Sequence, residues 1–338
     1  MGETKLLSCN ENDLEIASTL LRNGKIVGVP TETVYGLGAD ATNSKAVSSV
    51  FIAKGRPADN PLIVHISSID MLERIAFEIP DIAYKLAEEF WGGPLTMVLK
   101  KKGIIPSITS GGLDTVGVRM PSHPIIKRII ELAGIPIAAP SANISGYPSP
   151  TTAAHVMNDM AGKISAVVDG GTCHYGIEST VISFDDFQTV RILRPGCVTK
   201  EDLEQVCKKV IIDEAVLSNI KDNNYVRSPG MKYKHYSPKA NIVIINGSLE
   251  GFKKYISQHN GKKIYSLIYD KESGMFPYQH LTYGDNSVEH AQQLFSKLRE
   301  LDKIGAETVY VRTPNKDGVG LAVYNRLIRA AGFEVIEL

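Results

Sequence analysis

The sequence predicts an α/β protein with two domains, a larger one on a twisted mixed sheet and a smaller one on an open sheet. The chain has 338 residues, and a single core usually stops growing at about 250–300 residues. Short apolar runs typical of strands alternate with amphipathic patterns typical of helices. This alternation is interrupted at residues 211–240 and then resumes.

The first domain is predicted to occupy residues 1–210. Its first helix has Asn12 or Asp13 as a candidate N-cap and Gly24 as a stop signal. Thr199 and Asp202 have the spacing of a capping box at the start of its last helix. The predicted helices are 12–24, 44–53, 80–90, 123–133 and 199–209, and the predicted strands are 26–29, 62–66, 95–99, 116–119, 135–139, 166–169, 180–183 and 190–193. A polar loop is expected between the strand at 26–29 and the helix at 44–53.

Residues 211–240 carry turn formers, aromatic residues and cations but little apolar periodicity. Such a segment between domains is a linker by default. Its content of Tyr, Lys and His is richer than a spacer needs, which suggests that it docks on another part of the protein.

The second domain is predicted to occupy residues 241–338 as a small open α/β sheet. Its predicted strands are 242–245, 264–268, 308–311 and 333–336, and its predicted helices are 288–304 and 321–331. No catalytic constellation is recognisable in this part of the sequence.

The composition is that of an ordinary globular protein, with 43% hydrophobic and 22% charged residues. No segment approaches the roughly 20 apolar residues that a membrane-spanning helix needs, and the N-terminus lacks the apolar core of a signal peptide. We therefore expect a cytoplasmic protein that does not enter a membrane. Four cysteines without a Cys-x-x-Cys pair argue against a disulfide framework and a structural zinc site.

The charge distribution argues against stable binding to RNA. Residues 1–210 contain 20 Lys and Arg against 23 Asp and Glu, a net charge of −3, and the rest of the chain has a net charge of +3. Neither half has the strongly basic surface that binding to a phosphate backbone demands. A local basic groove could still be hidden in that average.

Two common nucleotide-binding motifs are excluded. Gly36-Leu-Gly38-Ala-Asp-Ala41 matches G-x-G-x-x-A formally, but residues 30–35 separate it from the preceding strand and the helix begins only after Asn43. The dinucleotide fingerprint must lie directly between strand and helix. No G-x-x-x-x-G-K-[ST] sequence is present, so an ATP site in this chain is not a P-loop.

Four cations stand at the ends of predicted elements. They are Lys54, Arg56, Arg119 and Arg194. Any one of them alone is best explained as a solvated or ion-paired side chain. Together with the polar residues Ser141, Asn143, Ser145 and Ser149, they resemble a cradle for a polyanion, because Arg binds phosphate and carboxylate groups in bidentate fashion.

The sequence alone does not assign a role to the other polar residues. His65 lies within a predicted strand and is at least as well explained as a satisfied core histidine. Ser179 and Thr180 can equally be sheet hydroxyls. No Ser-His-Asp or Cys-His arrangement has a supporting local context, so a covalent nucleophile is not indicated.

Several motifs in order along the chain resemble the YrdC-like family, including its Lys-x-Arg and Ser-x-Asn signatures. They are Thr31-Glu-Thr-Val-Tyr-Gly-Leu37, Lys54-Gly-Arg56-Pro57, Asn60-Pro-Leu62 and Pro140-Ser-Ala-Asn143. Gly176-Ile-Glu-Ser-Thr-Val181 and Arg194-Pro-Gly196 extend the similarity to about residue 210. Ser228-Pro-Gly-Met-Lys-Tyr-Lys-His-Tyr-Ser-Pro238 and the second domain resemble the longer, Sua-type threonylcarbamoyl-adenylate synthases.

The resemblance implies a YrdC-like catalytic domain, a Rossmann-like C-terminal domain and a linker at 211–240 that acts as a lid. It also implies a reaction, in which L-threonine, bicarbonate or CO2, and ATP give L-threonylcarbamoyl-adenylate and pyrophosphate. The product would supply the group placed on adenosine 37 of tRNAs that read ANN codons, and a separate complex would transfer it. Mg2+ would arrive with ATP, without protein ligands.

The resemblance also implies roles for particular residues. The catalytic residues would be Lys54, Arg56, Ser141 and Asn143. The ATP-binding residues would be Arg56, Asn60, Thr115, Ser141, Ser149, Arg194 and, in the lid, Tyr236. The threonine-binding residues would be Thr33, His65, Arg119, Ala139 and Ser179, with Arg119 taking the carboxylate.

Two other functions remain as alternatives. One is a module that binds double-stranded RNA or the ribosome without catalysis, against which the net charge of the first domain argues. The other is a nucleotide-dependent carbamoyl transferase, because related YrdC-like domains serve carbamoyl chemistry. Pyrophosphate release that depends on threonine distinguishes the synthase from both.

Overall fold

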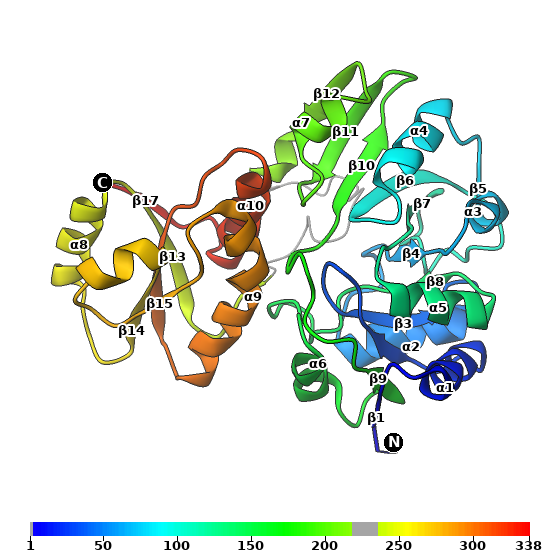
Figure 1. Ribbon diagram of the computed structural model, residues 1–338, viewed down its shortest axis with the longest axis horizontal. Helices are drawn as coiled ribbons and strands as arrows, with labels where there is room; N and C mark the ends of the chain where they lie inside the picture. Colours follow the sequence, from blue (N-terminus) through cyan, green and yellow to red (C-terminus); the bar gives the residue numbers. More distant parts are fainter. Residues whose placement is uncertain (1–2, 218–235) are drawn as a thin grey trace.

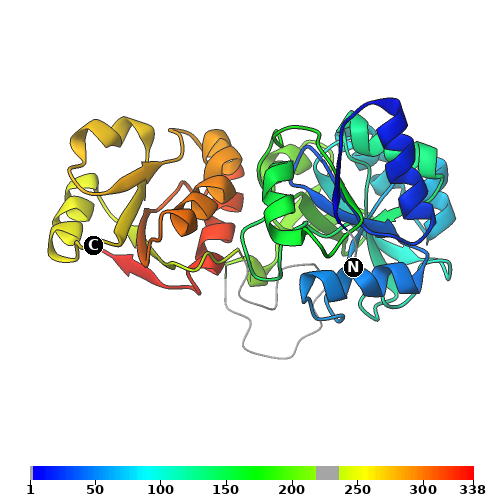
Figure 2. The same ribbon diagram turned by 90° about the horizontal axis from the view of Figure 1, so that it is seen from below.

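The computed structural model describes residues 3–217 and 236–338. It has two α/β bodies that lie side by side, the first formed by the N-terminal two thirds of the chain and the second by the C-terminal third (Figures 1 and 2). The predicted fold class is confirmed.

The first body contains one sheet of twelve strands. They are β1 (Lys5–Leu7), β2 (Val27–Val29), β3 (Gly36–Asp40), β4 (Ile63–His65), β5 (Ala76–Phe77), β6 (Leu95–Lys101), β7 (Thr115–Arg119), β8 (Ile137–Ala138), β9 (Ala166–Val168), β10 (Thr180–Phe184), β11 (Thr189–Arg194) and β12 (Lys209–Ile212). The order is β1-β9-β2-β3-β8-β4-β7-β6-β10-β11-β12, with β5 beside β6. The sheet contains parallel pairs, such as β4 with β7, and antiparallel pairs, such as β6 with β7, so it is mixed.

The helices around this sheet are α1 (Glu11–Arg22), α2 (Ser44–Lys54), α3 (Ile69–Ile75), α4 (Asp81–Phe90), α5 (Pro124–Ala133), α6 (Ala153–Met160) and α7 (Lys200–Glu204), followed by the 3-10 turn Glu214–Val216. Helix α5 shows why the sequence predicts most of them. Pro124 occupies its first turn, and Gly134 ends it in the left-handed conformation. Ile126, Ile129 and Ile130 recur at helical spacing and are buried.

The loop predicted between β2 and α2 is wrong at residues 36–40, which form strand β3. Two glycines in five residues hide a strand from sequence analysis because glycine has low β-propensity. They are needed here, since a Cβ on Gly36 would lie 3.0 Å from the Cβ of Ala139 and one on Gly38 would lie 3.2 Å from Ile137. Strand β3 pairs with β2 on one side and β8 on the other.

Other short elements escaped prediction. These are β1, α3, β5, α6 and β12 in the first body and α8 and β15 in the second. Helix α7 is shorter than the predicted 199–209, because the chain enters β12 at Lys209 and pairs with β11. The capping box of Thr199 and Asp202 is confirmed.

The second body has a five-stranded, fully parallel sheet in the order β15-β14-β16-β13-β17. Its strands are β13 (Asn241–Asn246), β14 (Ile264–Ile268), β15 (His280–Thr282), β16 (Thr308–Arg312) and β17 (Val335–Glu337). Its helices are α8 (Leu249–Gln258), α9 (Ser287–Lys303) and α10 (Val319–Ala330), with a 3-10 segment at Asp270–Met275. Helices α9 and α10 face the first body, and α8 lies on the outer side (Figure 1).

The two bodies share a tightly packed interface. Val34 and Ile177 of the first body belong to a buried apolar cluster that is otherwise built mainly by the second. Arg299 on α9 forms a two-point ion pair with Asp159 on α6, at 3.0 and 2.7 Å. A Cβ on Gly176, whose φ is +73°, would lie 2.5 Å from the carbonyl oxygen of Ala291. The backbones therefore approach as closely as a glycine permits.

Within the described residues, no helix combines the length and the apolar character needed to cross a membrane.

Candidate active site

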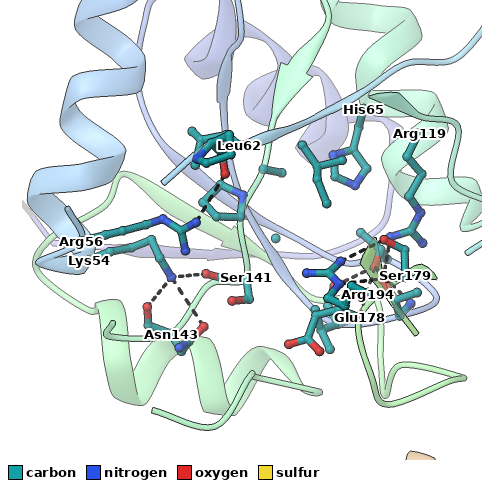
Figure 3. Close-up of a pocket in the computed structure, with 18 of the residues that line it drawn as sticks. Lys54, Arg56, Leu62, His65, Arg119, Ser141, Asn143, Glu178, Ser179 and Arg194 are labelled. Carbon is teal, nitrogen blue, oxygen red and sulfur yellow. Dashed lines mark hydrogen bonds between the residues drawn. The ribbon is translucent and has the colours of Figure 1, made fainter. Parts of the chain in front are cut away.

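A hollow in the first body collects the polar ends of several strands and loops. Helix α2 and the loop after β8 form one side, and β4, β7 and the segments next to β10 and β11 form the other (Figure 3). Eleven of the predicted site residues line it, namely Thr33, Lys54, Arg56, His65, Arg119, Ala139, Ser141, Asn143, Ser179, Arg194 and Tyr236. Segments from residue 31 to residue 236 thus converge on one place.

Lys54 is buried at the C-terminal end of α2 and holds the neighbouring loop in place. Its Nζ donates to the carbonyl oxygens of Ser141 and Asn143, and lies 3.5 Å from the Oδ1 of Asn143. Burial, and next the charge of Arg56, lower the pKa of Lys54 well below its usual value. This amine therefore ties the Lys-x-Arg segment to the Ser-x-Asn loop.

Arg56 makes fewer hydrogen bonds with the described residues than the other cations of the hollow. Gly55, in the left-handed conformation at φ 61°, reverses the chain after α2 so that Arg56 also faces the hollow. Its Nη2 makes only a long contact of 3.4 Å with the carbonyl oxygen of Pro61, and its Nε has no partner within the described part of the chain. Burial lowers the pKa of Arg56 to about 10, which leaves it charged at neutral pH.

Arg194 approaches from the end of β11 on the opposite side. Its Nε donates to the carbonyl oxygen of Ser179 at 3.1 Å and its Nη2 to the hydroxyl of Ser179 at 3.2 Å. Burial lowers its pKa as well. Cations placed this way in a partly desolvated hollow favour a polyanionic ligand, because their charges interact strongly with phosphate there.

Arg119 ends β7 and is buried with most of its donors satisfied. It forms an ion pair with Glu32, donates from Nη1 to the Thr33 hydroxyl at 2.8 Å, and donates from Nε to the carbonyl oxygen of Gly93 at 3.1 Å. The second oxygen of Glu32 has no partner among the described residues. Burial opposes ionisation of Glu32, but Arg119 outweighs it and holds the pKa of that carboxyl below its usual value.

His65 lies beside Arg119 on β4 (Figure 3). It is buried, and its Nδ1 has no partner within the described part of the chain. Burial, and next the charge of Arg119, lower its pKa to about 3. The imidazole is therefore neutral at physiological pH and offers one ring nitrogen to a ligand.

This neutral histidine predicts a pH-dependent stability. Its pKa is about 3 in the folded protein and about 6.5 in an unfolded chain. Between these values the unfolded chain binds more protons, so the free energy of unfolding falls as pH falls, by up to about 1.4 kcal/mol per pH unit from this group. We expect urea unfolding at pH 7, 6 and 5 to give a steeper loss for the wild type than for His65→Gln. Equal slopes would contradict a neutral buried His65.

Three predicted residues do not line the hollow. Asn60 is buried and its Oδ1 has no partner among the residues described. Thr115 begins β7 and lines a smaller adjoining cavity, which shares Pro61, Leu62 and Ile63 with the hollow. The hydroxyl of Ser149 donates to the carboxylate of Glu178.

Some residues at the site were given no role by the sequence. Thr31, named there as part of the first motif, lines the hollow with its hydroxyl 2.8 Å from that of Thr33. Glu178 also lines it, although only its motif was noted. Glu178 could have been recognised in the sequence as an acidic residue among small polar ones directly before β10. Glu32 was overlooked within the Thr31–Leu37 motif.

Comparisons with known proteins find relatives along nearly the whole chain. A family model described as "Telomere recombination" matches residues 19–196, and one described as "Threonylcarbamoyl-AMP synthase, C-terminal domain" matches residues 198–332. The chain is 45% identical to the threonylcarbamoyl-AMP synthase of Pyrococcus abyssi over 332 residues, 96% of either chain. It is 42% identical to that of Bacillus subtilis over 340 residues, 98% of this chain and 97% of the relative.

Solved structures extend this similarity to the whole fold. The crystal structure of P. abyssi Sua5 complexed with L-threonine matches with a TM-score of 0.93 and 43% identity, over 99% of this chain and 100% of that one. A variant of the same protein matches with a TM-score of 0.92. With both family models in order and relatives aligned from end to end, the chain belongs to the two-domain threonylcarbamoyl-AMP synthase family.

Proposed function

We propose that this chain condenses L-threonine, bicarbonate or CO2, and ATP to L-threonylcarbamoyl-adenylate and pyrophosphate, with water released when bicarbonate is used. The observation that carries the proposal is one hollow with two differently built ends. Arg56 and Arg194 bring positive charge beside Lys54, and Arg119 with its hydroxyl and imidazole neighbours suits a small amino acid. Membership of the family supports the same reaction.

The reaction requires positioning more than covalent chemistry. The amine of threonine attacks the carbon of CO2 or bicarbonate and forms a carbamate. A carbamate oxygen then attacks the α-phosphorus of ATP, and the bond to pyrophosphate breaks. ATP brings about four negative charges, and the carbamate and carboxylate add two more, so the protein must hold anions together and offset their charge.

At the ATP end, we assign the phosphates to Arg56 and Arg194, with Lys54 alongside. Lys54, Arg56, Ser141 and Asn143 are the proposed catalytic set, because the contacts of Lys54 fix the 141–143 loop against the helix that carries Arg56. Asn60, Thr115, Ser149 and Tyr236 complete the proposed ATP contacts. Thr115 would act from the adjoining cavity, and Ser149 through its hydroxyl, which now donates to Glu178.

At the other end, Arg119 would receive the carboxylate of threonine. Its terminal nitrogens each have a second hydrogen beyond those donated to Thr33 and Glu32, so it can bind the ligand while it keeps these partners. Thr33, His65, Ala139 and Ser179 would contact the rest of the amino acid. The neutral imidazole of His65 accepts or donates a hydrogen bond there without adding charge.

ATP itself would provide the protein-independent ligands that Mg2+ needs at this site. Among the described residues, no group of three or more His, Cys, Asp or Glu side chains could hold a metal ion. Of the described residues that line the hollow, Glu178 alone is acidic, and it is already paired. We therefore assign Mg2+ to the phosphates of ATP and no protein ligand to it.

The domain division is part of the proposal. Residues 1–210 would form the catalytic domain, 211–240 a lid that shields the labile adenylate from water, and 241–338 the C-terminal domain. Most of the lid lies outside the described residues, but Tyr236 at its end is buried against the hollow. The product would pass to a separate tRNA threonylcarbamoyl transferase complex in the cytoplasm, without stable tRNA binding by this chain.

The test is pyrophosphate release from the full chain with ATP, L-threonine, bicarbonate and Mg2+. We expect release to require threonine, and mass spectrometry to detect threonylcarbamoyl-adenylate. Carbamoyl phosphate in place of threonine and bicarbonate should give none. Release without threonine, or tight RNA binding with no release, would overturn the proposal.

A further inference from the structure

An arginine on helix α10 of the second body contacts segments that border the candidate site. Arg326 on α10 has no exposed surface. Its Nε donates to Oε2 of Glu178 at 2.8 Å, and its Nη2 lies 3.3 Å from the carbonyl oxygen of Glu178. Its Nη1 donates to the carbonyl oxygen of Pro195 at 2.9 Å. Its Nη1 also donates to the Oδ1 of Asn325 on the same helix at 2.9 Å. The bonds to Glu178 and Pro195 go to segments of the first body that border the hollow.

Glu178 presents an electrostatic problem for an ATP site. It is the one acidic side chain among the described residues that line the hollow, and it is buried. A buried carboxylate beside a triphosphate would repel it strongly, because the local dielectric is low. The ion pair with Arg326 removes that repulsion, and the other carboxylate oxygen stays free to accept the hydroxyl of Ser149.

The guanidinium of Arg326 also contacts Tyr236, which lies near the end of the predicted linker. It lies over the ring of Tyr236 at 5.6 Å, and that ring stacks on Phe295 of α9 at 5.3 Å. Tyr236 lines the hollow. The second body therefore contacts the ATP end at two points through one side chain. Arg119 at the threonine end instead donates to Glu32, Thr33 and Gly93 of the first body.

We infer that Arg326 is a positioning residue through which the C-terminal domain makes the ATP end usable, by neutralising Glu178 and fixing it against Ser149. This inference rests on the proposed function. It assigns to residues 241–338 a specific task in the reaction. It also explains why a charged side chain is kept fully buried between the bodies, where an unpaired one would be strongly destabilising.

The first test is the Michaelis constant for each substrate in Arg326→Gln. Loss of the positive charge leaves Glu178 unneutralised, so we expect the KM for ATP to rise at least about tenfold, a change of about 1.4 kcal/mol in binding. The KM for threonine should change less than about threefold. The control is Arg312→Gln, which breaks a similarly buried pair with Glu272 inside the second body. Equal rises in the KM for ATP in both variants would overturn the inference.

The pH profile adds a readout that a purely structural role would not change. The groups that face Glu178 are Arg326, Arg194 and Ser149, with Lys54 and Tyr236 close enough to interact electrostatically. Without Arg326, burial raises the pKa of Glu178, and its protonation at lower pH removes the repulsion. The ratio of the KM for ATP in Arg326→Gln to that in wild type should therefore fall between pH 8 and pH 6. A constant ratio would contradict the inference.

A double variant separates charge compensation from packing. Arg326→Gln with Glu178→Gln removes both charges, so we expect the KM for ATP to return to within about fivefold of wild type. Replacing both partners of a buried pair is better tolerated than breaking one, so this variant decides the question if the single variant does not fold. A folded double variant with the KM for ATP raised tenfold or more would overturn the inference.

Measurements on the wild-type enzyme distinguish the proposed function from the role of Arg326. Absence of threonine-dependent pyrophosphate release by wild type would refute the proposed function. Normal release by wild type with an unchanged KM for ATP in Arg326→Gln would refute only the role of Arg326.

Discussion

Arg56→Ala should reduce threonine-dependent pyrophosphate release by about 10²–10³-fold, the range seen when one preorganised charge-stabilising donor is removed. The reason is that Arg56 makes one long contact, to Pro61, among the described residues, which leaves most of its donors available to a ligand there. The measurement is kcat and KM for ATP by a coupled pyrophosphate assay.

The same substitution should leave the fold intact. Arg56 lies close enough to Arg194 for their charges to repel, and it also lowers the pKa of Lys54. Removing it relieves this repulsion but also loses the long hydrogen bond and the favourable interactions with Tyr236 and Asp59, so we expect a melting temperature close to that of wild type. Lys45→Ala, at an exposed cation in the first turn of the same helix, is the matched control and should keep full activity. An active Arg56→Ala enzyme would remove Arg56 from the proposed catalytic set.

The contrast between Arg56 and Arg119 shows what could be predicted from the sequence. Both stand at the end of an element, and their position and residue type led to the prediction of an anion site; the structure brings both side chains into one hollow. Their partners were not predictable, because Glu32 pairs with a residue 87 positions away and Glu178 with one 148 positions away. Such pairs depend on which strands and helices become neighbours, which local periodicity does not determine.

The secondary-structure elements also divide into those that local sequence predicts and those that depend on distant contacts. Helices such as α5 were predictable because their caps and apolar stripe are local. Strand β3 was not predictable, because its two glycines fit close contacts with distant residues. These are Ile137 of strand β8 and Ala139, which directly follows that strand. The sequence thus pointed to the cations that line the hollow, but not to the ion pairs that the carboxylates Glu32 and Glu178 make.

Arg119→Met should abolish threonine-dependent activity and also destabilise the protein by about 3–5 kcal/mol. Arg119 is the counter-charge of Glu32, and both side chains are almost fully buried, with exposures of 4% and 6%. Removing it leaves a buried carboxylate without compensation. Urea unfolding measures the loss of stability. Arg128→Met, which breaks an exposed pair with Glu11, should leave the free energy of unfolding nearly unchanged, because solvent screens exposed pairs.

A second substitution separates the two effects of losing Arg119. Arg119→Met with Glu32→Gln removes both charges, so most of the lost stability should return. The variant should remain inactive, because the threonine carboxylate still lacks its cation. Stability without activity would show that Glu32 holds Arg119 in place, while Arg119 itself binds the substrate. If activity returned with stability, Arg119 would be a structural residue, and the threonine carboxylate would need another partner in the hollow.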